Sequence, residues 1–272
     1  MNKQKEFNKI LRDIKSIKIQ GARNVAIAGL KAYRLNPSEA SKKKIISVRP
    51  TEPFLINVLN KKENLSPKGL IERLKYNQDI MNKEVFKLIK NGNVVFTHCH
   101  SSTVVEALIY CNKKGKRFEV YNTEARPLYQ GRITAIQLRK AGIKVTMFVD
   151  SAAGIALEKE NRKDKIHADL VILGTDAILK NGVINKVGSG MFSEIAYDNK
   201  IPVYILADSL KYISKIKLEQ RNFKEVWNTS KGIKGIRIEN PAFELIDKKY
   251  VTAIISEYGK LSYDKFLRKV RK

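Results

Sequence analysis

The stretch Val94–Thr103 most limits what this chain can fold into, because it joins a strand to a helix through a short polar turn. Its first three residues favour extended structure, and helical spacing begins at its end. In open parallel sheets, ligands bind at the carboxyl ends of such strands, beside helix N-termini. Cys99 lies at this tip, where the positive end of the helix favours its thiolate. The alternative is a buried, inert cysteine behind an ordinary turn.

From Asn93 onward, short β-favouring runs alternate with helical segments. The runs are Val94–Phe96, Phe118–Asn122, Val145–Val149, Leu170–Leu173, Val203–Leu206 and Ala253–Ile255. This alternation predicts an α/β fold of Rossmann-like type, with a doubly wound parallel sheet of about six strands. No G-x-G-x-x-G motif follows the first run, and Gly188-Ser189-Gly190 is too short a signature for a dinucleotide loop. We therefore expect no cofactor.

The first 90 residues have helical patterns instead, from an amphipathic segment over residues 5–18 to a long helix that reaches Ile89. Asn91-Gly92 ends this helix and marks the change of period. We therefore predict two domains, a helical domain over residues 1–90 and a Rossmann-like sheet domain over residues 91–272.

Two turns in the helical part suit an anion. Gly21-Ala22-Arg23 opens a helix, which allows a ligand to approach closely and places Arg23 to meet a negative charge. Arg49-Pro50-Thr51 precedes another helix N-terminus, an arrangement suited to phosphate. The alternative for the first turn is a tight connection between two helices.

Polar and charged residues follow the ends of the predicted strands. They are Cys99, Glu124, Arg126, Asp150, Asp176, Asn185, Lys186 and Lys211. One Asp or Arg at a strand end is usually a helix cap or an ion-pair partner, but residues converging on one sheet edge indicate an active site. A partly buried Asp176 would have a raised pKa and could act as acid or base.

A zinc site is the alternative for the cysteine, because His98 and His100 flank Cys99. Neighbouring side chains of an extended segment point apart, however, and His167 precedes the fourth predicted strand on the opposite edge. We predict no metal site.

The chain is strongly basic, with 53 Lys and Arg against 27 Asp and Glu and a net charge of +26. The basic residues are spread along the sequence, without a basic tail, a zinc-finger spacing or an RNA-recognition signature. The charge therefore predicts weak, non-specific affinity for RNA or acidic partners rather than a dedicated nucleic-acid reader. A Lys-rich surface adapted to heat would have the same composition.

The cellular location of the protein can be predicted from its cysteines and its hydropathy. Cys99 and Cys111 make no disulfide framework and indicate a reducing compartment. The N-terminus has no apolar core of signal-peptide type, and no apolar run approaches the ~18 residues of a membrane helix. The sequence predicts a soluble, cytoplasmic protein with no membrane association.

A series of segments resembles one family, which contains ribose-1,5-bisphosphate isomerase, 5-methylthioribose-1-phosphate isomerase and the α, β and δ regulatory subunits of translation initiation factor 2B. The segments are Gly21-Ala22, Arg49–Thr51, Thr97–Cys99, Thr123–Pro127 with Gln130-Gly131, Gly174–Asp176, Val183–Gly188 and Asn240–Phe243. They extend over nearly the whole chain. Their order is specific to the superfamily and less decisive about the branch.

The resemblance implies a sugar-phosphate isomerase that acts on a pentose 1-phosphate, most like the conversion of ribose-1,5-bisphosphate to ribulose-1,5-bisphosphate in AMP salvage. The catalytic cysteine and aspartate of the isomerases match Cys99 and Asp176. The alternative is a non-catalytic regulatory subunit of initiation-factor-2B type, because those subunits usually lack one or both residues. Family members form dimers through the sheet domain, and some form hexamers, so we expect a homo-oligomer.

The chemistry needs two protic groups around the sugar. A thiol with an ordinary pKa of ~8.5 is mostly protonated near neutral pH and can donate to the ring oxygen, while an ionised Asp176 accepts the proton of the C2 hydroxyl or of C2. A hydride shift and an enediolate both remain open.

The expected substrate ligands are Gly21, Ala22, Arg23, Arg49, Arg126, Asn185 and Lys186. Four positions depart from the isomerase pattern: Gln20 stands for Arg, Arg23 for Gly, His100 for Asn, and Ala125 for Thr.

Overall fold

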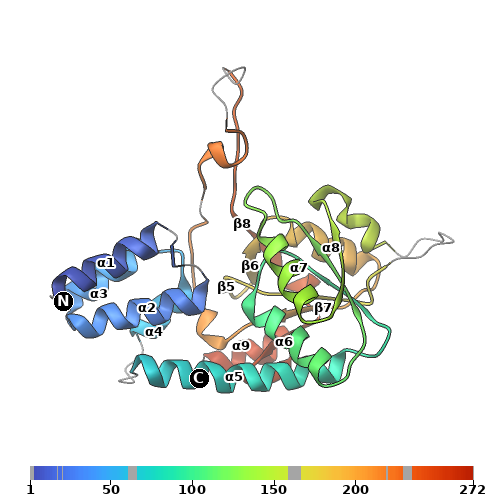
Figure 1. The fold of residues 1–272 in the computed structure, drawn as a ribbon, viewed down its shortest axis with the longest axis horizontal. Helices are drawn as coiled ribbons and strands as arrows, with labels where there is room; N and C mark the ends of the chain where they lie inside the picture. The colour runs from blue at the N-terminus through green and yellow to red at the C-terminus, as the bar shows by residue number, and fades with distance from the viewer. Residues whose placement is uncertain are drawn as a thin grey trace.

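The computed structural model describes residues 3–16, 18–19, 21–60, 66–158, 167–218, 220–228 and 235–271 (Figure 1). Gln20 lies outside these residues. The helices are α1 (Lys3–Lys15), α2 (Ala22–Leu35), α3 (Glu39–Val48), α4 (Pro53–Asn60), α5 (Pro67–Leu88), α6 (Ser102–Lys113), α7 (Gln130–Lys140), α8 (Ser189–Asp198) and α9 (Tyr263–Val270). Short 3₁₀ turns are η1 (Asp150–Ala156), η2 (Ser209–Lys211), η3 (Phe223–Glu225) and η4 (Lys248–Tyr250).

The strands form two sheets. Their bounds are β1 (Val94–Thr97), β2 (Glu119–Thr123), β3 (Lys144–Phe148), β4 (Leu170–Leu173), β5 (Ala177–Ile178), β6 (Gly182–Lys186), β7 (Val203–Leu206), β8 (Phe243–Asp247), β9 (Ala253–Ser256) and β10 (Gly259–Leu261). The large sheet has the order β10-β9-β7-β4-β1-β2-β3, and the small one has the order β5-β6-β8.

The α/β fold with a mostly parallel sheet is confirmed. All six predicted strands belong to the large sheet, where they pair in parallel. The seventh strand, β10, turns back antiparallel on β9. Because β10 is short and its side chains are at most half-buried, its sequence has too weak an apolar pattern to predict a strand.

Helices cover both faces of the large sheet, and alternate residues of each strand point to opposite faces. Apolar residues of α5, α6 and α7 pack on one face, around Val95, Val120 and Ile172. Residues of η1, α8 and α9 pack on the other face, around Phe96 and Val171. The inner strands β1, β4, β7 and β9 are mostly apolar on both faces because both are covered, whereas the edge strand β3 is partly exposed.

The N-terminal helices form a core of their own around Phe7, Ile14, Val25 and Phe54. The amphipathic helix predicted over residues 5–18 corresponds to α1, which begins and ends slightly earlier. Helix α3 lies in a segment whose apolar spacing is weak, and the sequence analysis gave no helix there. Ser38 caps it by accepting a hydrogen bond from Ser41 N–H at 3.1 Å.

Helix α5 belongs to both cores. Leu70 and Leu74 pack with the N-terminal helices, whereas Met81 and Val85 pack against the sheet, so the helix runs along the underside of the molecule in Figure 1. The domain boundary after residue 90 remains a proposal, and α5 is its connecting element.

Candidate functional site

Strand order places the site. Strands β2 and β3 follow β1 to one side and β4, β7 and β9 lie on the other, so the connections reverse direction between β1 and β4. In doubly wound sheets the ligand site lies outside the carboxyl ends of the strands at this reversal. Cys99 follows β1, and Asp176 follows β4, so the two residues flank the reversal point.

Cys99 occupies a strained turn. Its φ of +64° is in the left-handed region, which residues other than glycine rarely adopt. The hydroxyl of Thr134, on α7, donates to the Cys99 carbonyl at 2.9 Å and holds this turn. The chain then enters α6, where Ser101 Oγ accepts from Val104 N–H. The turn therefore carries the thiol between a strand end and a helix N-terminus.

Asp176 is held by the turn after β4. Its N–H donates to the Ile184 carbonyl at 2.8 Å, and the Thr175 hydroxyl donates to the carbonyls of Ile184 and Ala177 at 2.5 and 2.8 Å. Gly174 allows the close approach to α6, because a Cβ there would lie 2.5 Å from Ser101 Oγ. The two turns that carry the predicted catalytic residues, Cys99 and Asp176, are therefore in contact.

Six charged or ionisable groups lie near one another at these strand ends and are linked through their electrostatic effects on Asp176, Glu52 or Cys99; we call them the strand-end cluster. They are Arg49, Glu52, Cys99, Asp176, Lys186 and Lys211. Arg49 and Glu52 come from the turn between α3 and α4, Cys99 and Asp176 follow β1 and β4, Lys186 ends β6, and Lys211 ends η2. Three cationic side chains face two carboxyls and a thiol, a balance that attracts anions.

Burial dominates the protonation of the two predicted catalytic residues. It raises the pKa of the Cys99 thiol to about 11, and the Asp176 and Asp150 carboxylates act in the same direction. The expected preference for a thiolate is therefore wrong: the cost of burying the charge outweighs the helix N-terminus. Burial also raises the pKa of Asp176, while Lys211, Arg49 and Lys186 lower it.

Two lysines complete the cluster. The Lys211 ammonium donates to the Thr175 carbonyl, next to Asp176. Burial lowers the pKa of Lys211, and the carboxylates of Asp176 and Glu52 oppose this change. Lys186 ends β6, and burial lowers its pKa as well, with Cys99 among the groups that raise it. Both lysines therefore face the predicted catalytic pair.

The turn between α3 and α4 presents two unsatisfied polar atoms. Arg49 Nε and Glu52 Oε1 are buried, and neither has a hydrogen-bond partner among the described residues. Such atoms are rare in folded proteins, and each calls for an explanation. Their place in the strand-end cluster points to a polar ligand.

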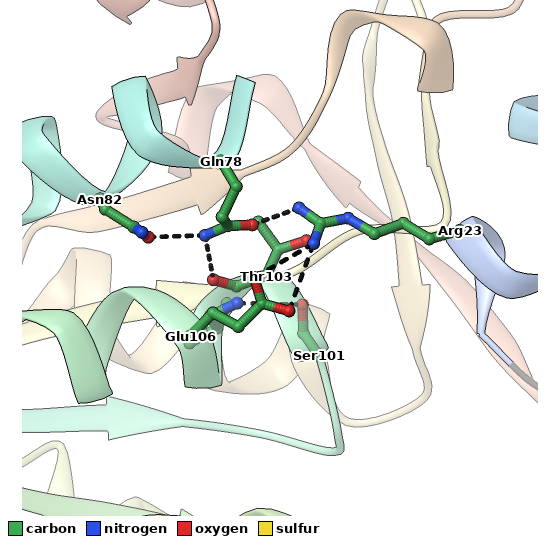
Figure 2. Close-up of polar contacts among 7 residues, drawn as sticks. Arg23, Gln78, Asn82, Ser101, Thr103 and Glu106 are labelled. Carbon is green, nitrogen blue, oxygen red and sulfur yellow. Dashed lines mark hydrogen bonds and ion pairs between the residues drawn. The ribbon is translucent and has the colours of Figure 1, made fainter. Parts of the chain in front are cut away.

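Arg23 is engaged within the protein. From the first turn of α2 it reaches Gln78 on α5 and pairs with Glu106 on α6 at 3.3 Å, as Figure 2 shows. Gln78 in turn donates to Asn82 Oδ1 at 2.6 Å and to the Thr103 carbonyl at 3.1 Å. Arg23 thus links the N-terminal helices to the helix that follows Cys99.

Gly21 and Ala22 form the turn at which α2 begins. Gly21 has a φ of +82° and occupies the N-cap position of the helix, and Ala22 is its first residue. Glycine takes this conformation without strain.

The remaining predicted ligands lie around the cluster. Arg126 is exposed, with its guanidinium 5.1 Å from the centre of the Tyr129 ring and 2.6 Å from its hydroxyl. The N–H groups of Ala125 and Arg126 donate to Asp150, whose charge acts on Cys99 and Lys186.

Asn185 is buried and donates to Ser189 Oγ at 2.9 Å. The roles of these residues toward a substrate remain predictions.

The two histidines beside Cys99 make hydrogen-bond contacts with other residues of the chain. The His98 ring lies 2.5 Å from Thr123 Oγ1 and 2.9 Å from the Val187 carbonyl, and burial lowers its pKa to about 4. His100 Nδ1 lies 3.0 Å from Thr134 Oγ1. Within the described ranges, no three His, Cys, Asp or Glu side chains gather to hold a metal ion.

Glu52 and Thr134 were not predicted from the sequence. Glu52 lies between Thr51 and Pro53, just before an apolar helix. An acidic residue directly before such a helix indicates a carboxyl that becomes buried when the helix packs. Thr134 lies in the middle of α7, and its register carries no comparable signal.

Comparison with known proteins gives consistent results. The profile of the Initiation factor 2 subunit family matches residues 40–263. The ribose 1,5-bisphosphate isomerases of Methanocaldococcus jannaschii and Archaeoglobus fulgidus are 32% and 29% identical to the chain, with 90% of this chain covered in each case and 88% and 86% of those proteins. A crystal structure of the Pyrococcus horikoshii translation initiation factor eIF-2B has a TM-score of 0.78 and 26% identity, covering 94% of this chain and 96% of that one.

None of the described helices is both long and apolar enough to cross a membrane.

Proposed function

Because this chain belongs to the Initiation factor 2 subunit family, we propose that its strand-end cluster is the active site of a sugar-phosphate isomerase. The substrate is a pentose 1-phosphate, and the reaction is most like the conversion of ribose 1,5-bisphosphate to ribulose 1,5-bisphosphate, the substrate in the name of two relatives. The observation that carries the proposal is the position of Cys99 and Asp176 at the two strand ends that flank the sheet's reversal point, close enough for the Asp176 carboxylate to raise the pKa of the thiol.

The two groups divide the proton transfers. The Cys99 thiol donates its proton to the ring oxygen as the C1–O bond of the ring breaks, and Asp176 accepts the proton released from the C2 hydroxyl or C2. If Asp176 takes the C2 hydroxyl proton, hydride moves from C2 to C1; if Asp176 takes the C2 proton, it delivers that proton to C1. Either route gives the ketose, and the proton lost by the C2 hydroxyl balances the one donated by Cys99. A thiol whose pKa is about 11 keeps its proton at neutral pH and is ready to donate it.

The cationic residues hold the phosphate. Arg49, Lys186 and Lys211 surround the catalytic pair, and the buried Arg49 Nε has an unused hydrogen bond to offer, with no acceptor in the described part of the chain. Gly21 and Ala22 supply N–H groups at the start of α2. Arg23, Arg126 and Asn185 stay proposed ligands at the border of the site.

The test is turnover of ribose 1,5-bisphosphate, followed by phosphorus NMR. Cys99→Ser and Asp176→Asn should each lower turnover by about 10²–10⁴-fold, the usual scale for one general acid or base. The double variant should be little worse than either, because the two groups act as a unit. Cys111→Ser and the exposed Asp198→Asn are the matched controls. Full activity of Asp176→Asn would refute the mechanism.

A regulatory subunit of initiation-factor-2B type is the second candidate. The observation that favours it is Arg23, which is bound to Glu106 and Gln78 rather than directed at a ligand. The similarity to the eIF-2B structure supports it as well. This candidate predicts no turnover by the unaltered protein with any pentose 1-phosphate, so the same assay separates the two functions.

We also propose a homo-oligomer that works in a reducing compartment such as the cytoplasm. The free thiols of Cys99 and Cys111 support the compartment. A long arm leaves the body between η2 and β8 in Figure 1; its described residues are 213–218, 220–228 and 235–242. It exposes several large apolar side chains, which supports association with a second copy, as a dimer or a hexamer. The net charge supports weak, non-specific RNA binding.

A further inference from the structure

Glu52 is an acidic residue in a site whose expected ligand is an anion. It precedes Pro53, and its carbonyl accepts the first hydrogen bond of α4, from Ile56 N–H at 3.2 Å. The residue is only 6% exposed, and its Oε1 has no hydrogen-bond partner among the described residues. A buried carboxyl in this position is costly unless it serves a ligand or carries a proton.

Three charged groups from three elements face Glu52. They are Arg49 at the end of α3, Asp176 after β4, and Lys211 in η2. Helix α4 is fixed to η2 because Asn57 Nδ2 donates to the carbonyls of Leu210 and Tyr212 at 2.6 and 2.7 Å. Glu52 is therefore held beside the two cations that would bind a phosphate group.

We propose that Glu52 takes up a proton when a phosphate group binds to Arg49 and Lys211, so that the site accepts the dianion with Glu52 neutral. The inference rests on the proposed function, and it adds a residue that determines how binding depends on pH. The exchange is balanced: the ligand brings two negative charges, and one proton from solvent enters with it. An ionised Glu52 would repel the dianion and compete with it for Lys211.

The protonation of Glu52 supports the proposal. Burial and the neighbouring Asp176 raise its pKa to about 7, against the lowering effect of Lys211 and Arg49. At neutral pH the proton is therefore gained at little cost. Above that pH, affinity should fall by up to about tenfold per pH unit, the limit for one coupled proton.

Calorimetry can count the proton directly. Ribose 1,5-bisphosphate is titrated into the Cys99→Ser protein, whose turnover should be about 10²–10⁴-fold lower, and into Cys99→Ser with Glu52→Gln. Each titration is run at pH 8 in two buffers with different ionisation enthalpies. The ligand's own phosphate groups titrate near pH ~6 and contribute equally to both proteins. The difference between the proteins therefore isolates Glu52.

We expect the protein with Glu52 to take up nearly one proton more per ligand than the Glu52→Gln protein. Between pH 7 and 9 its affinity should fall roughly 20-fold further, if the pKa of Glu52 rises by about two units on binding. Glu39→Gln, an exposed acid in the first turn of α3, is the matched control and should leave both quantities unchanged. Glu52→Ala, with thermal melts of every variant, provides a second neutral side chain.

The two proposals fail in different ways. Tight binding with equal proton uptake and equal pH dependence, with and without the Glu52→Gln substitution, would overturn the role of Glu52 and leave the phosphate site intact. An absence of binding to the Cys99→Ser protein at every pH would overturn the phosphate site, and the inference with it. Loss of binding in both Glu52 variants with unchanged melts would show that the carboxylate serves the ligand directly, which also contradicts proton uptake.

Discussion

The pKa values of single residues in the site depend more on burial than on the neighbouring residues in the sequence. Cys99 stands at a helix N-terminus, a position that favours a thiolate, yet burial raises its pKa to about 11. The surroundings of Cys99 come from distant parts of the chain, such as Thr134 on α7, Asp150 in η1 and Asp176 after β4. Burial also makes Cys99 suitable as a proton donor and unsuitable as a nucleophile near neutral pH.

The pH dependence of alkylation checks this. Because the folded-state pKa of Cys99 lies above the ordinary value, its thiolate fraction should rise about tenfold per pH unit from pH 7 to 9 without levelling off. Iodoacetamide modification of Cys99, measured by mass spectrometry, should follow that slope. Cys111, whose pKa burial raises to about 12, serves as the internal comparison. A plateau of the Cys99 rate below pH 8 would contradict the assignment of a protonated thiol.

The sequence predicted the candidate site's composition better than its contacts. Cys99, Asp176, Lys186 and Arg49 were expected together, and they all belong to the strand-end cluster. Strand ends can be found from β-favouring runs, and parallel strands bring their ends to one edge. The ion pair of Arg23 with Glu106 could not be predicted, because it depends on how α2 docks against α6.

At the scale of elements, the site depends on the contact between the end of β4 and the start of α6. The predicted strands were found because each is a short run of β-favouring residues; most of them are buried on both faces, whereas the edge strand β3 is partly exposed. Helix α3 was missed because it is weakly amphipathic, and in the small sheet β5-β6-β8 strand β5 has only two residues, too few to show a period. The pairing of β6 with β8 joins segments about sixty residues apart, a separation that local patterns do not reveal.

Gly174→Ala tests the contact between β4 and α6. The added Cβ would lie 2.5 Å from Ser101 Oγ and 2.6 Å from Ser101 Cβ, so the two turns must separate. We expect a loss of stability of about 1–3 kcal/mol, typical of overpacking, together with a marked fall in isomerase turnover. Thermal melts and the phosphorus NMR assay measure the two effects.

Gly154→Ala is the matched control for that substitution. Its added Cβ would meet only ordinary contacts at 3.7 Å, to Glu158 and Ile195, so stability and turnover should barely change. Equal effects of the two alanine substitutions would show that loss of glycine itself, and not the approach of β4 to α6, is responsible.

The whole molecule combines two cores with a projecting arm. Helix α5 connects the cores, and the strand-end cluster lies where the N-terminal helices meet the sheet, since Arg49 and Glu52 come from the former and Asp176 and Lys211 from the latter. The two chain segments of the arm are joined by a hydrogen bond in which Arg221 N–H donates to the Asn240 carbonyl at 3.0 Å. The charge of Arg221 lowers the pKa of Lys186 and that of Glu225 raises it, so these residues of the arm lie near the strand-end cluster.

The arm therefore offers a test of the proposed oligomer. Phe223 and Trp227 lie on one short turn, 42% and 45% exposed, and such side chains are stabilised when a partner covers them. The double substitution Phe223→Ser with Trp227→Ser should shift the protein to a smaller species in sedimentation velocity, with the thermal melt of the protomer's two cores retained. Tyr76→Ser removes a more exposed ring, 67% exposed on α5, and should leave the association state unchanged. If the arm variant sediments like the unaltered protein while Tyr76→Ser does not, the interface lies on the helical side and the arm has another role.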